Sequence, residues 1–425
     1  MRPPVEHPPS AELTTVTRDR AAVGWSFISL YALSYAGGAL LFLAPLLVSL
    51  ALKVDHLVGL ADAPRNLALV TGVGSLLSIV SNPFFGRLSD RTTSRWGMRR
   101  PWMVVGLVGG TTGILTVALA PNIAVVLLGW CIAQVFLNAL LAAQVAVLPD
   151  QVPVGQRGLV SGVLGICLPV ASVVGTFLVQ TFDANDLATF LAPCVVGAAV
   201  VVVFVTRLDD RRLDPADRPP WSLRQLVGSF YVNPRANPDF AWAFVSRFLL
   251  IMAYAFLVTY QAYYLIAQLG MAEDAVPHQI FLGTVVQSVA LVVAAPVTGR
   301  LSDRSGRRKV FVVVAGVVYS VAMVVIATST ASGGYLVGMA IGGFGFGMYM
   351  AVDLALVVDV LPETGSSAKD LGVLNIAGAL PFALAPALAP VLLAVSGSSY
   401  RVLYLVAGVC ALLGAAAIVP IRRVR

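Results

Sequence analysis

The stretch GRLSDRTTSRWGMRRPW, residues Gly86–Trp102, decides how this chain of 425 residues is interpreted. It is a short charged segment between two long apolar runs, and a shorter copy, GRLSDRSGRRK, follows at Gly299–Lys309. The shared GRLSDR positions are 213 residues apart, and the first copy then holds four extra residues before Gly97. The pattern predicts one membrane unit that occurs twice in the chain.

The composition excludes an ordinary water-soluble domain. Hydrophobic residues make up 58% of the chain and charged residues 12%, which is about half the charged share of soluble proteins. A helix that crosses a membrane needs roughly 20 mostly apolar residues. We therefore expect an all-α integral membrane protein with twelve spans, at residues 24–51, 66–86, 101–120, 123–148, 158–182, 187–206, 240–268, 279–299, 310–330, 334–361, 371–395 and 401–420.

The distribution of basic residues predicts the orientation. If the N-terminus is cytoplasmic, all but four of the 28 Lys and Arg residues lie on that side. The exceptions are Lys53, Arg65 and Arg401 outside, and Arg247 within a span. This asymmetry follows the positive-inside rule and places both termini in the cytoplasm. Residues 1–20 have no apolar core, so no cleavable signal is expected there.

A repeat divides the spans into two sets of six. Pro83 and Pro296, and the tripeptides LPD at 148–150 and LPE at 361–363, share the offset of 213 residues. Two parallel six-span repeats are typical of rocker-type transporters with a substrate site between the halves near mid-membrane. The predicted parts are a cytoplasmic tail (1–20), an N-terminal bundle (21–206), a cytoplasmic linker (207–239) and a C-terminal bundle with a short basic tail (240–425).

The linker contains a candidate amphipathic helix at residues 221–232. Its apolar side chains recur at helical spacing, which favours a helix on the inner membrane surface. The alternative is a disordered linker, because Gly228 lies in the middle of the segment.

The charged loop carries a resemblance to a known family. The pattern Gly-x-x-x-Asp-Arg followed by Gly-x-Arg-Arg resembles the signature loop between spans 2 and 3 of the major facilitator superfamily. The matching residues are Gly86, Asp90, Arg91, Gly97, Arg99 and Arg100, and in the second copy Gly299, Asp303, Arg304, Gly306, Arg307 and Arg308. SDRTTSRWGMRRPW is also similar to the loop of sucrose-transporter-like proteins and of glycoside–pentoside–hexuronide cation symporters. The resemblance implies alternating access and a sugar or glycoside as substrate.

Two departures from related patterns narrow this expectation. Span 2, at 67–85, contains no acidic residue, unlike the sodium-coupled members of the symporter group. This argues against a melibiose-type sodium site. Span 5 lacks the Gly-Pro-x-x-Gly-Gly element of many drug antiporters in the superfamily, which argues against drug export.

The loop charges predict a gate on the cytoplasmic side. We expect Asp90 to face the N-terminus of span 11 near Asp370–Leu371, where the helix dipole favours a negative charge. Arg91, Arg99 and Arg100 are expected to pair with Asp150 or with lipid phosphates. Arg157 follows Asp150 in LPDQVPVGQRG, which is similar to a common transporter pattern of an acid followed by Arg-Gly. The alternative is that all these charges only set the topology.

Two charged residues within spans are the candidate coupling pair. Arg247 in span 7 and Asp353 in span 10 each lie about 12 Å deep at 1.5 Å per residue. The resemblance implies that spans 1, 4, 7 and 10 line a shared cavity, where the pair can meet. The pair then handles a proton or substrate, or else is a fixed ion pair that fastens two helices. Asp359, near the end of span 10, is expected to reach the membrane interface.

Other polar residues on the same four spans are candidate substrate contacts. Tyr254 and Gln261 follow Arg247 at intervals of seven, and Tyr349 is one turn before Asp353. The remaining candidates form pairs at i, i+4, namely Gln134 with Asn138 and Tyr31 with Tyr35. Amides, phenols and one ion pair suit a polyhydroxylated ligand, and suit a mildly polar drug almost as well. For Gln134 and Asn138 the alternative role is to fasten helices.

No catalytic or metal-binding cluster is apparent in the sequence. The four cysteines lie in apolar runs and the three histidines are dispersed. We expect no cofactor and no nucleic acid partner, but a monomeric, multi-pass protein of a bacterial cytoplasmic membrane that interacts with lipid, protons and a small molecule. The expected function is proton-coupled symport of a sugar or glycoside. The alternatives are proton-antiporting export of a small organic compound, and a sensor that transports nothing.

Overall fold

The computed structural model describes residues 22–218, 237–360 and 376–421. Three of the predictions fall outside this part of the chain: the N-terminal tail, the amphipathic helix at 221–232 and the contact of Asp90 with Asp370–Leu371. The side chain of Asp359 also lies outside the description.

The regular structure of the described residues is helical, as predicted. The first half contains α1 (Trp25–Ala44), a π-helical turn (Pro45–Ser49), α2 (Leu50–Val58), α3 (Ala63–Asp90), α4 (Arg100–Ala118), α5 (Ile123–Gln151), α6 (Val154–Thr181) and α7 (Asp186–Arg207). After a 3-10 turn at Pro215–Asp217, the second half contains α9 (Pro238–Ala267), a 3-10 turn (Glu273–Ala275), α10 (Val276–Ser305), α11 (Arg308–Thr328), α12 (Ser332–Val360), α14 (Pro381–Val395) and α15 (Tyr400–Ala416).

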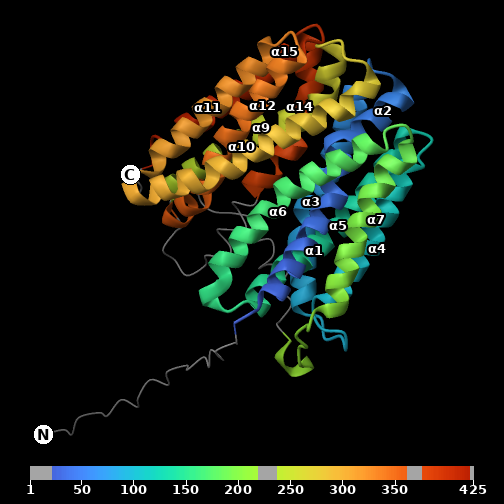
Figure 1. Ribbon diagram of the computed structural model, residues 1–425, viewed down its shortest axis with the longest axis vertical. Coiled ribbons are helices and arrows are strands. Elements are labelled where there is room, and N and C mark those ends of the chain that lie inside the picture. Colours follow the sequence, from blue (N-terminus) through green and yellow to red (C-terminus); the bar gives the residue numbers. More distant parts are fainter. Residues whose placement is uncertain (1–21, 219–236, 361–375, 422–425) are drawn as a thin grey trace, which may run out of the picture.

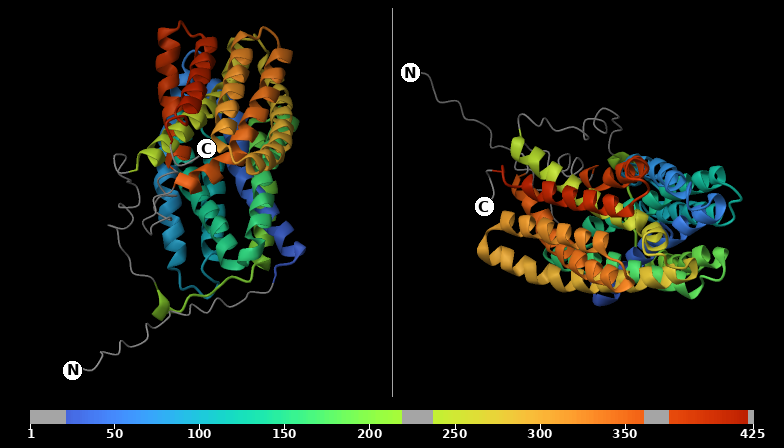
Figure 2. Two further views of the ribbon diagram at one scale, coloured as in Figure 1. Left: turned by 90° about the vertical axis from the view of Figure 1, so that its left-hand side faces the viewer. Right: turned by 90° about the horizontal axis from the view of Figure 1, so that it is seen from above.

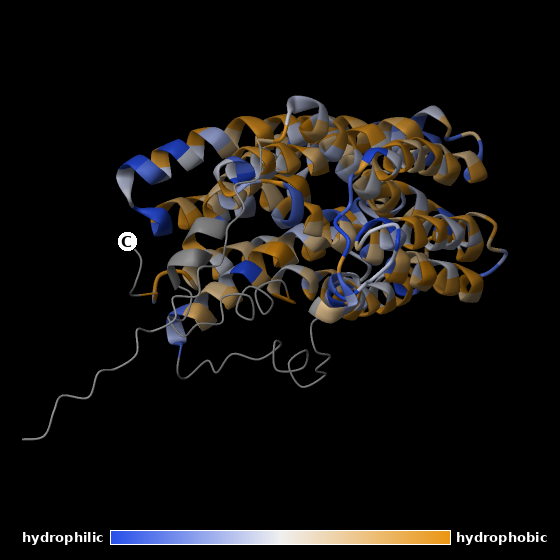
Figure 3. Cartoon of the chain, turned by 90° about the horizontal axis from the view of Figure 1, so that it is seen from below, coloured by the Kyte–Doolittle hydropathy of each residue, from blue (hydrophilic) through white to orange (hydrophobic). Residues whose placement is uncertain are grey.

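Eleven helices of the described residues are long and apolar enough to cross a membrane, and α15 is a shorter apolar helix. The first span runs continuously from Trp25 to Val58, further than predicted, because the turn at Pro45–Ser49 joins α1 to α2. The eleventh is described from Ile376, and its first turn ends at Leu380. In Figure 3 hydrophobic residues predominate along the helices, while hydrophilic residues gather at helix ends and in the connecting loops.

Asparagine side chains define where two spans begin. Asn122 accepts a hydrogen bond from the backbone N–H of Val125 at the start of α5, at 3.1 Å. Asn185 accepts from the N–H groups of Leu187 and Ala188 at the start of α7. These caps satisfy backbone donors that have no partner within the helix, so they stabilise the helix ends.

Two helix bundles make up the molecule. Figure 1 shows α1–α7 as one group and α9–α15 as another, and the two groups stay distinct in both views of Figure 2. Small residues allow close approach within each bundle. A Cβ atom added at Gly347 of α12 would lie 2.6 Å from the carbonyl oxygen of Leu291 in α10.

The bundles pack against each other chiefly through α3 with α14 and through α6 with α10, and hydrogen bonds from α9 also join them. We call the side on which α1 begins the near side, and the side of the α2–α3 turn the far side. Gln261 Nε2 donates to the carbonyl oxygen of Leu47 in the π-helical turn at 3.3 Å, and the Tyr263 hydroxyl donates to Ala51 of α2 at 2.9 Å. The hydroxyl of Tyr260 lies 3.4 Å from the carbonyl oxygen of Pro64 in α3. We call this set of contacts the far-side seam.

The far-side seam is the closed end of the molecule. The seam extends to mid-membrane, where the Ser75 hydroxyl of α3 donates to the carbonyl of Phe382 in α14 at 3.0 Å. Further contacts between the halves lie at the far side, where His278 of α10 bonds Gln180 of α6 at 2.9 Å and His56 lies 3.6 Å from Glu273. The described conformation is therefore held together at the far side.

Candidate functional site

An ion pair joins α9 to α12 in the second half. Arg247 Nη1 lies 2.7 Å from Asp353 Oδ2, and the Tyr349 hydroxyl donates to Asp353 Oδ1 at 2.6 Å. The side chain of Arg247 is 20% exposed and that of Asp353 is 9% exposed. Burial strengthens such a pair but makes either ion costly if the other is removed. The structure thus brings together three of the candidate residues in one buried cluster.

The Arg247 guanidinium has donor capacity left over. Its Nε is buried and has no hydrogen-bond partner among the described residues. Nε and Nη2 both face Gly378, and a Cβ atom there would lie 3.7 Å from each. A guanidinium offers five N–H donors in a planar fork, of which the carboxylate uses only part. The guanidinium therefore keeps hydrogen-bonding capacity beyond the ion pair.

Aromatic rings extend this cluster along α9. Tyr254 stacks on Phe346 of α12, with ring centroids 4.4 Å apart and planes 12° apart. Phe382 of α14 meets Tyr254 edge-on at 6.2 Å. The rings provide flat apolar faces beside the ionic cluster.

The first half contributes amides instead of charges. Asn138 Nδ2 on α5 donates to the carbonyl oxygen of Gln134 at 2.8 Å. Asn82 Nδ2 on α3 donates to Asn138 Oδ1 at 3.4 Å. Asn82 was not predicted as a site residue, although a lone amide in an apolar run indicates a candidate polar contact. Both Gln134 and Asn138 are buried, so their contacts within the bundle also suit the fastening role.

Two candidate substrate contacts lie elsewhere than expected. Tyr31 is fully buried within the first half, where its hydroxyl donates to the carbonyl oxygen of Gln144 at 2.7 Å, while Tyr35 is half-buried on α1. Gln261 belongs to the far-side seam, and its Oε1 accepts from the Tyr335 hydroxyl at 3.0 Å. The seven-residue stripe places Gln261 on the same face of α9 as Arg247, but about 21 Å further along the helix at 1.5 Å per residue.

The near-side loop of the first half folds around Arg99. Its guanidinium lies 2.7 Å from Asp90 through Nη1 and 2.7 Å from Asp150 through Nε, and it also bonds Ser89. Burial disfavours the charge of Arg99, but the two carboxylates outweigh it and raise its pKa above the ordinary value. We call Arg99, Asp90, Asp150 and their linker partner Asp210 the near-side cluster.

Asp210 comes from the linker and caps α4. Its Oδ2 accepts backbone N–H groups of Arg99 and Arg100 at 2.6 and 2.9 Å. Burial raises the pKa of Asp210, opposed by these two N–H groups and by the Arg99 charge. Gly97 packs against this carboxylate with a φ of 103°, a region that side chains rarely adopt. Asp210 is 111 residues from Arg99 in sequence, and its contact with Arg99 was not predicted.

The remaining loop residues occupy helix ends. Arg100 Nη2 donates to the carbonyl of Thr206 at 3.1 Å. Arg157 donates to the carbonyls of Val152 and Pro149, both at 3.1 Å, and so satisfies the end of α5. The other candidates lie at the ends of α3 and α10 and at the start of α11, namely Gly86, Arg91, Gly299, Asp303, Arg304, Arg307 and Arg308.

No group of three or more His, Cys, Asp or Glu residues suited to a metal ion occurs among the residues that the structure describes.

Comparison with known proteins places these features in context. The sequence profile of the Major Facilitator Superfamily matches residues 26–277 and 266–425. Among curated proteins, an "Uncharacterized symporter" of Synechocystis sp. is 43% identical over 53 residues, which are 12% of this chain and 10% of that protein. The chain thus matches about a tenth of that relative's length.

Solved transporter structures share the fold. A point mutant of the nucleoside transporter NupG superposes with a TM-score of 0.73 at 12% identity, over 93% of this chain and 99% of that one. A POT family transporter in complex with a thioalcohol-conjugated peptide gives 0.73 at 12% identity, over 92% and 95%. The human organic anion transporter MFSD10 gives 0.68 at 17% identity, over 92% and 98%. At these identities the likeness shows the fold alone.

Proposed function

Since the chain belongs to the Major Facilitator Superfamily and is a membrane transporter rather than an enzyme, we propose that it carries a sugar or glycoside together with protons by alternating access. The buried cluster of Arg247, Asp353 and Tyr349 carries this proposal. It unites the one intramembrane acid–base pair of the described spans with an unused hydrogen-bond donor. Ionisable residues within membrane spans mark substrate and ion pathways by default.

Asp353 is the proposed proton carrier. When it is ionised, Arg247 and the Tyr349 hydroxyl stabilise its charge. A proton on Asp353 removes the attraction and releases the guanidinium for an incoming ligand oxygen. Substrate and proton then favour the same state, which is the requirement for symport.

The neighbouring groups support a polyhydroxylated substrate. Arg247 Nε supplies a free donor, and the stacked pair of Tyr254 and Phe346 supplies apolar faces for the C–H surface of a sugar ring. Asn138 and Gln134 are the proposed contacts from the first half. Two similarities favour symport. The Gly86–Trp102 loop resembles that of sugar symporters, and the Synechocystis relative is described as a symporter.

The far-side seam and the near-side cluster are the two proposed gates. With the predicted orientation the near side is cytoplasmic, so the described conformation opens inward. Asp90 has a 53% exposed side chain, which leaves it free to exchange Arg99 for a partner from the second half when the near side closes. We thus assign the loop the role of a latch with different partners in two states.

The alternative is proton-antiporting export of a small organic compound through the same pair. The observation in its favour is the spare donor of Arg247, because a guanidinium also binds carboxylates. In this alternative the compound and the proton occupy the Arg247–Asp353 pair in turn.

The test is uptake of labelled disaccharides into proteoliposomes, with and without an inward proton gradient. Gradient-driven accumulation is expected in the wild type and is lost in Asp353→Asn, whereas counterflow exchange is retained. Asp62→Asn is the matched control, because Asp62 is exposed and makes no side-chain capping bond. Absence of sugar flux in the wild type, together with efflux of an organic anion that dissipates the gradient, would overturn symport in favour of export.

A further inference from the structure

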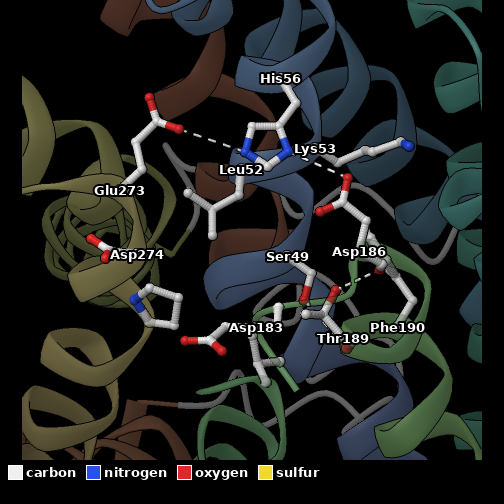
Figure 4. A pocket seen from close by; sticks show the side chains of 13 residues that line it. Ser49, Leu52, Lys53, His56, Asp183, Asp186, Thr189, Phe190, Glu273 and Asp274 are labelled. Atoms are coloured by element: carbon white, nitrogen blue, oxygen red, sulfur yellow. Dashed lines mark hydrogen bonds and ion pairs between the residues drawn. The ribbon is translucent and has the colours of Figure 1, made fainter. Parts of the chain in front are cut away.

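A cavity of about 580 Å³ lies between the two halves at the far side. Its walls come from α2, from the α6–α7 loop and α7, and from the 3-10 turn that precedes α10 (Figure 4). Charged groups predominate in it: Lys53, His56, Asp183, Asp186, Glu273 and Asp274. The proposed substrate site uses none of these residues.

His56 connects the two halves across this cavity. Its Nδ1 lies 3.3 Å from Asp186 Oδ2 on α7 of the first half. Its Nε2 lies 3.6 Å from Glu273 Oε2 in the second half. Figure 4 shows the imidazole ring between the two carboxylates, with one on either side.

This geometry is suited to a protonated ring. A neutral imidazole has one N–H donor and one nitrogen lone pair, while a carboxylate only accepts. One of the two carboxylates would then face a lone pair and be repelled. Only the imidazolium presents an N–H to both, so protonation creates the link between Asp186 and Glu273.

Most of the charged groups around His56 are carboxylates. On its own helix, Asp55 is buried with Oδ2 unpartnered, and Lys53 supplies the one other cation of the cavity. Asp183 and Asp186 face it from the first half, and Glu273 and Asp274 from the second. The carboxylates outnumber the lysine, and His56 lies in the last turn of α2, where the helix dipole also favours a cation.

We propose that His56 is a proton-dependent latch that holds the far side closed. Protonation links α7 to the turn before α10 and favours the conformation that opens at the near side. Deprotonation removes the link and allows the far side to open. This inference rests on the alternating access proposed above. Acidity at the far side opposes opening of that side, and this effect is separate from the proton carried by Asp353.

A distance measurement across the far side tests the latch directly. Ala61 and Ala331 are exposed in the α2–α3 and α11–α12 turns, away from the cavity charges. Both are changed to Cys in full-length protein whose four native cysteines are replaced, and spin labels report their separation by double electron–electron resonance. Raising the pH from about 5 to about 8 is expected to increase the ratio of open to closed far side by up to about fivefold, the upper end of the range for an exposed ion pair.

Three variants identify the responsible group. His56→Gln is expected to abolish the pH dependence, and His56→Arg to keep the far side closed at high pH, because arginine stays charged. His278→Gln is the matched control. His278 also bridges the halves, but it bonds the uncharged amide of Gln180 through Nδ1 at 2.9 Å, so the pH dependence should persist.

The outcomes separate this inference from the proposed function. A pH-independent separation in the wild type, or a pH response that survives in His56→Gln, overturns the latch even if sugar transport is intact. A response confined to His56 supports the latch even if proteoliposomes transport no sugar. The absence of sugar transport would overturn only the symport proposal.

Discussion

The two halves connect their first and fourth membrane helices with different chemistry. In the first half, Gln144 Nε2 on α5 donates to the carbonyl of Ser34 on α1 at 2.7 Å. In the second half, Arg247 on α9 and Asp353 on α12 form an ion pair at 2.7 Å. Arg247 follows Ser34 by the 213-residue repeat offset, whereas Asp353 follows Gln144 by 209 residues, so the two connections differ in position by one helical turn on the fourth helix. The first is a neutral tie that cannot exchange a proton, whereas the second can.

The largest expected effect on stability comes from removing one partner of the Arg247–Asp353 ion pair. Arg247→Met leaves Asp353 buried without its counter-charge and should destabilise the protein by about 3 kcal/mol. Removing both charges in Arg247→Met/Asp353→Leu should recover most of that loss, because two apolar groups need no counter-ion. Thermal unfolding in detergent measures the stability of the single and double variants. A double variant no more stable than the single one would show that the pair contributes more than mutual neutralisation.

The second-largest effect on stability is expected at Gly97, a glycine that packs against the near-side cluster. Gly97→Ala should destabilise the protein by about 2–3 kcal/mol, because φ is 103° and the new Cβ would collide with the Asp210 carboxylate. The same unfolding measurement applies. Combining the change with Asp210→Gly should relieve the collision, because the Asp210 Cβ is also too close, but leave the backbone strain. An equal loss in the single and double variants would exclude Asp210 as the obstacle.

Breaking the neutral connection should have a smaller effect. Gln144→Leu removes the donor to Ser34 and should cost about 1–2 kcal/mol. Because no charge is left unpaired, the proton dependence of transport should match the wild type. Uptake measured against pH, with Asp353→Asn beside it, compares the two connections. A shifted pH profile in Gln144→Leu would contradict the assignment of proton handling to the second half alone.

The sequence predicted the spans and their repeat because membrane burial depends on long apolar runs. The helices from α3 to α12 begin and end near the expected residues. The expected residues Arg247 and Asp353 also lie together, since two buried opposite charges on adjacent helices have few other partners.

Contacts that depend on depth or on distant loops could not be predicted. Gln261 shares a helical stripe with Arg247, but periodicity gives the face of a helix and not the neighbour at each depth. Asp210 reaches Arg99 from a separate loop, and no local pattern encodes that approach. The carbonyl of Leu47 accepts from Gln261 within a π-helical turn at Pro45–Ser49, which hydropathy does not reveal.

The smallest expected effect concerns Gly306, which ends α10 in the second copy of the loop. Its φ is 63° and its ψ 13°, close to the left-handed helical region, and a Cβ there would meet nothing within 4 Å. Gly306→Ala should thus cost only about 1 kcal/mol of backbone strain. Gly306→Asn should cost less, because asparagine tolerates this conformation better than alanine.

Comparing Gly97→Ala with Gly306→Ala separates strain from packing in the two loops. Both glycines have positive φ, but only Gly97 packs against a carboxylate from the linker. If unfolding shows Gly97→Ala to be the more damaging by more than about 1 kcal/mol, the excess combines the Asp210 contact with the less favourable φ of Gly97, and the double variant with Asp210 divides the two. Equal losses would mean that the two copies of the loop are constrained alike, and that the near-side cluster adds no rigidity of its own at Gly97.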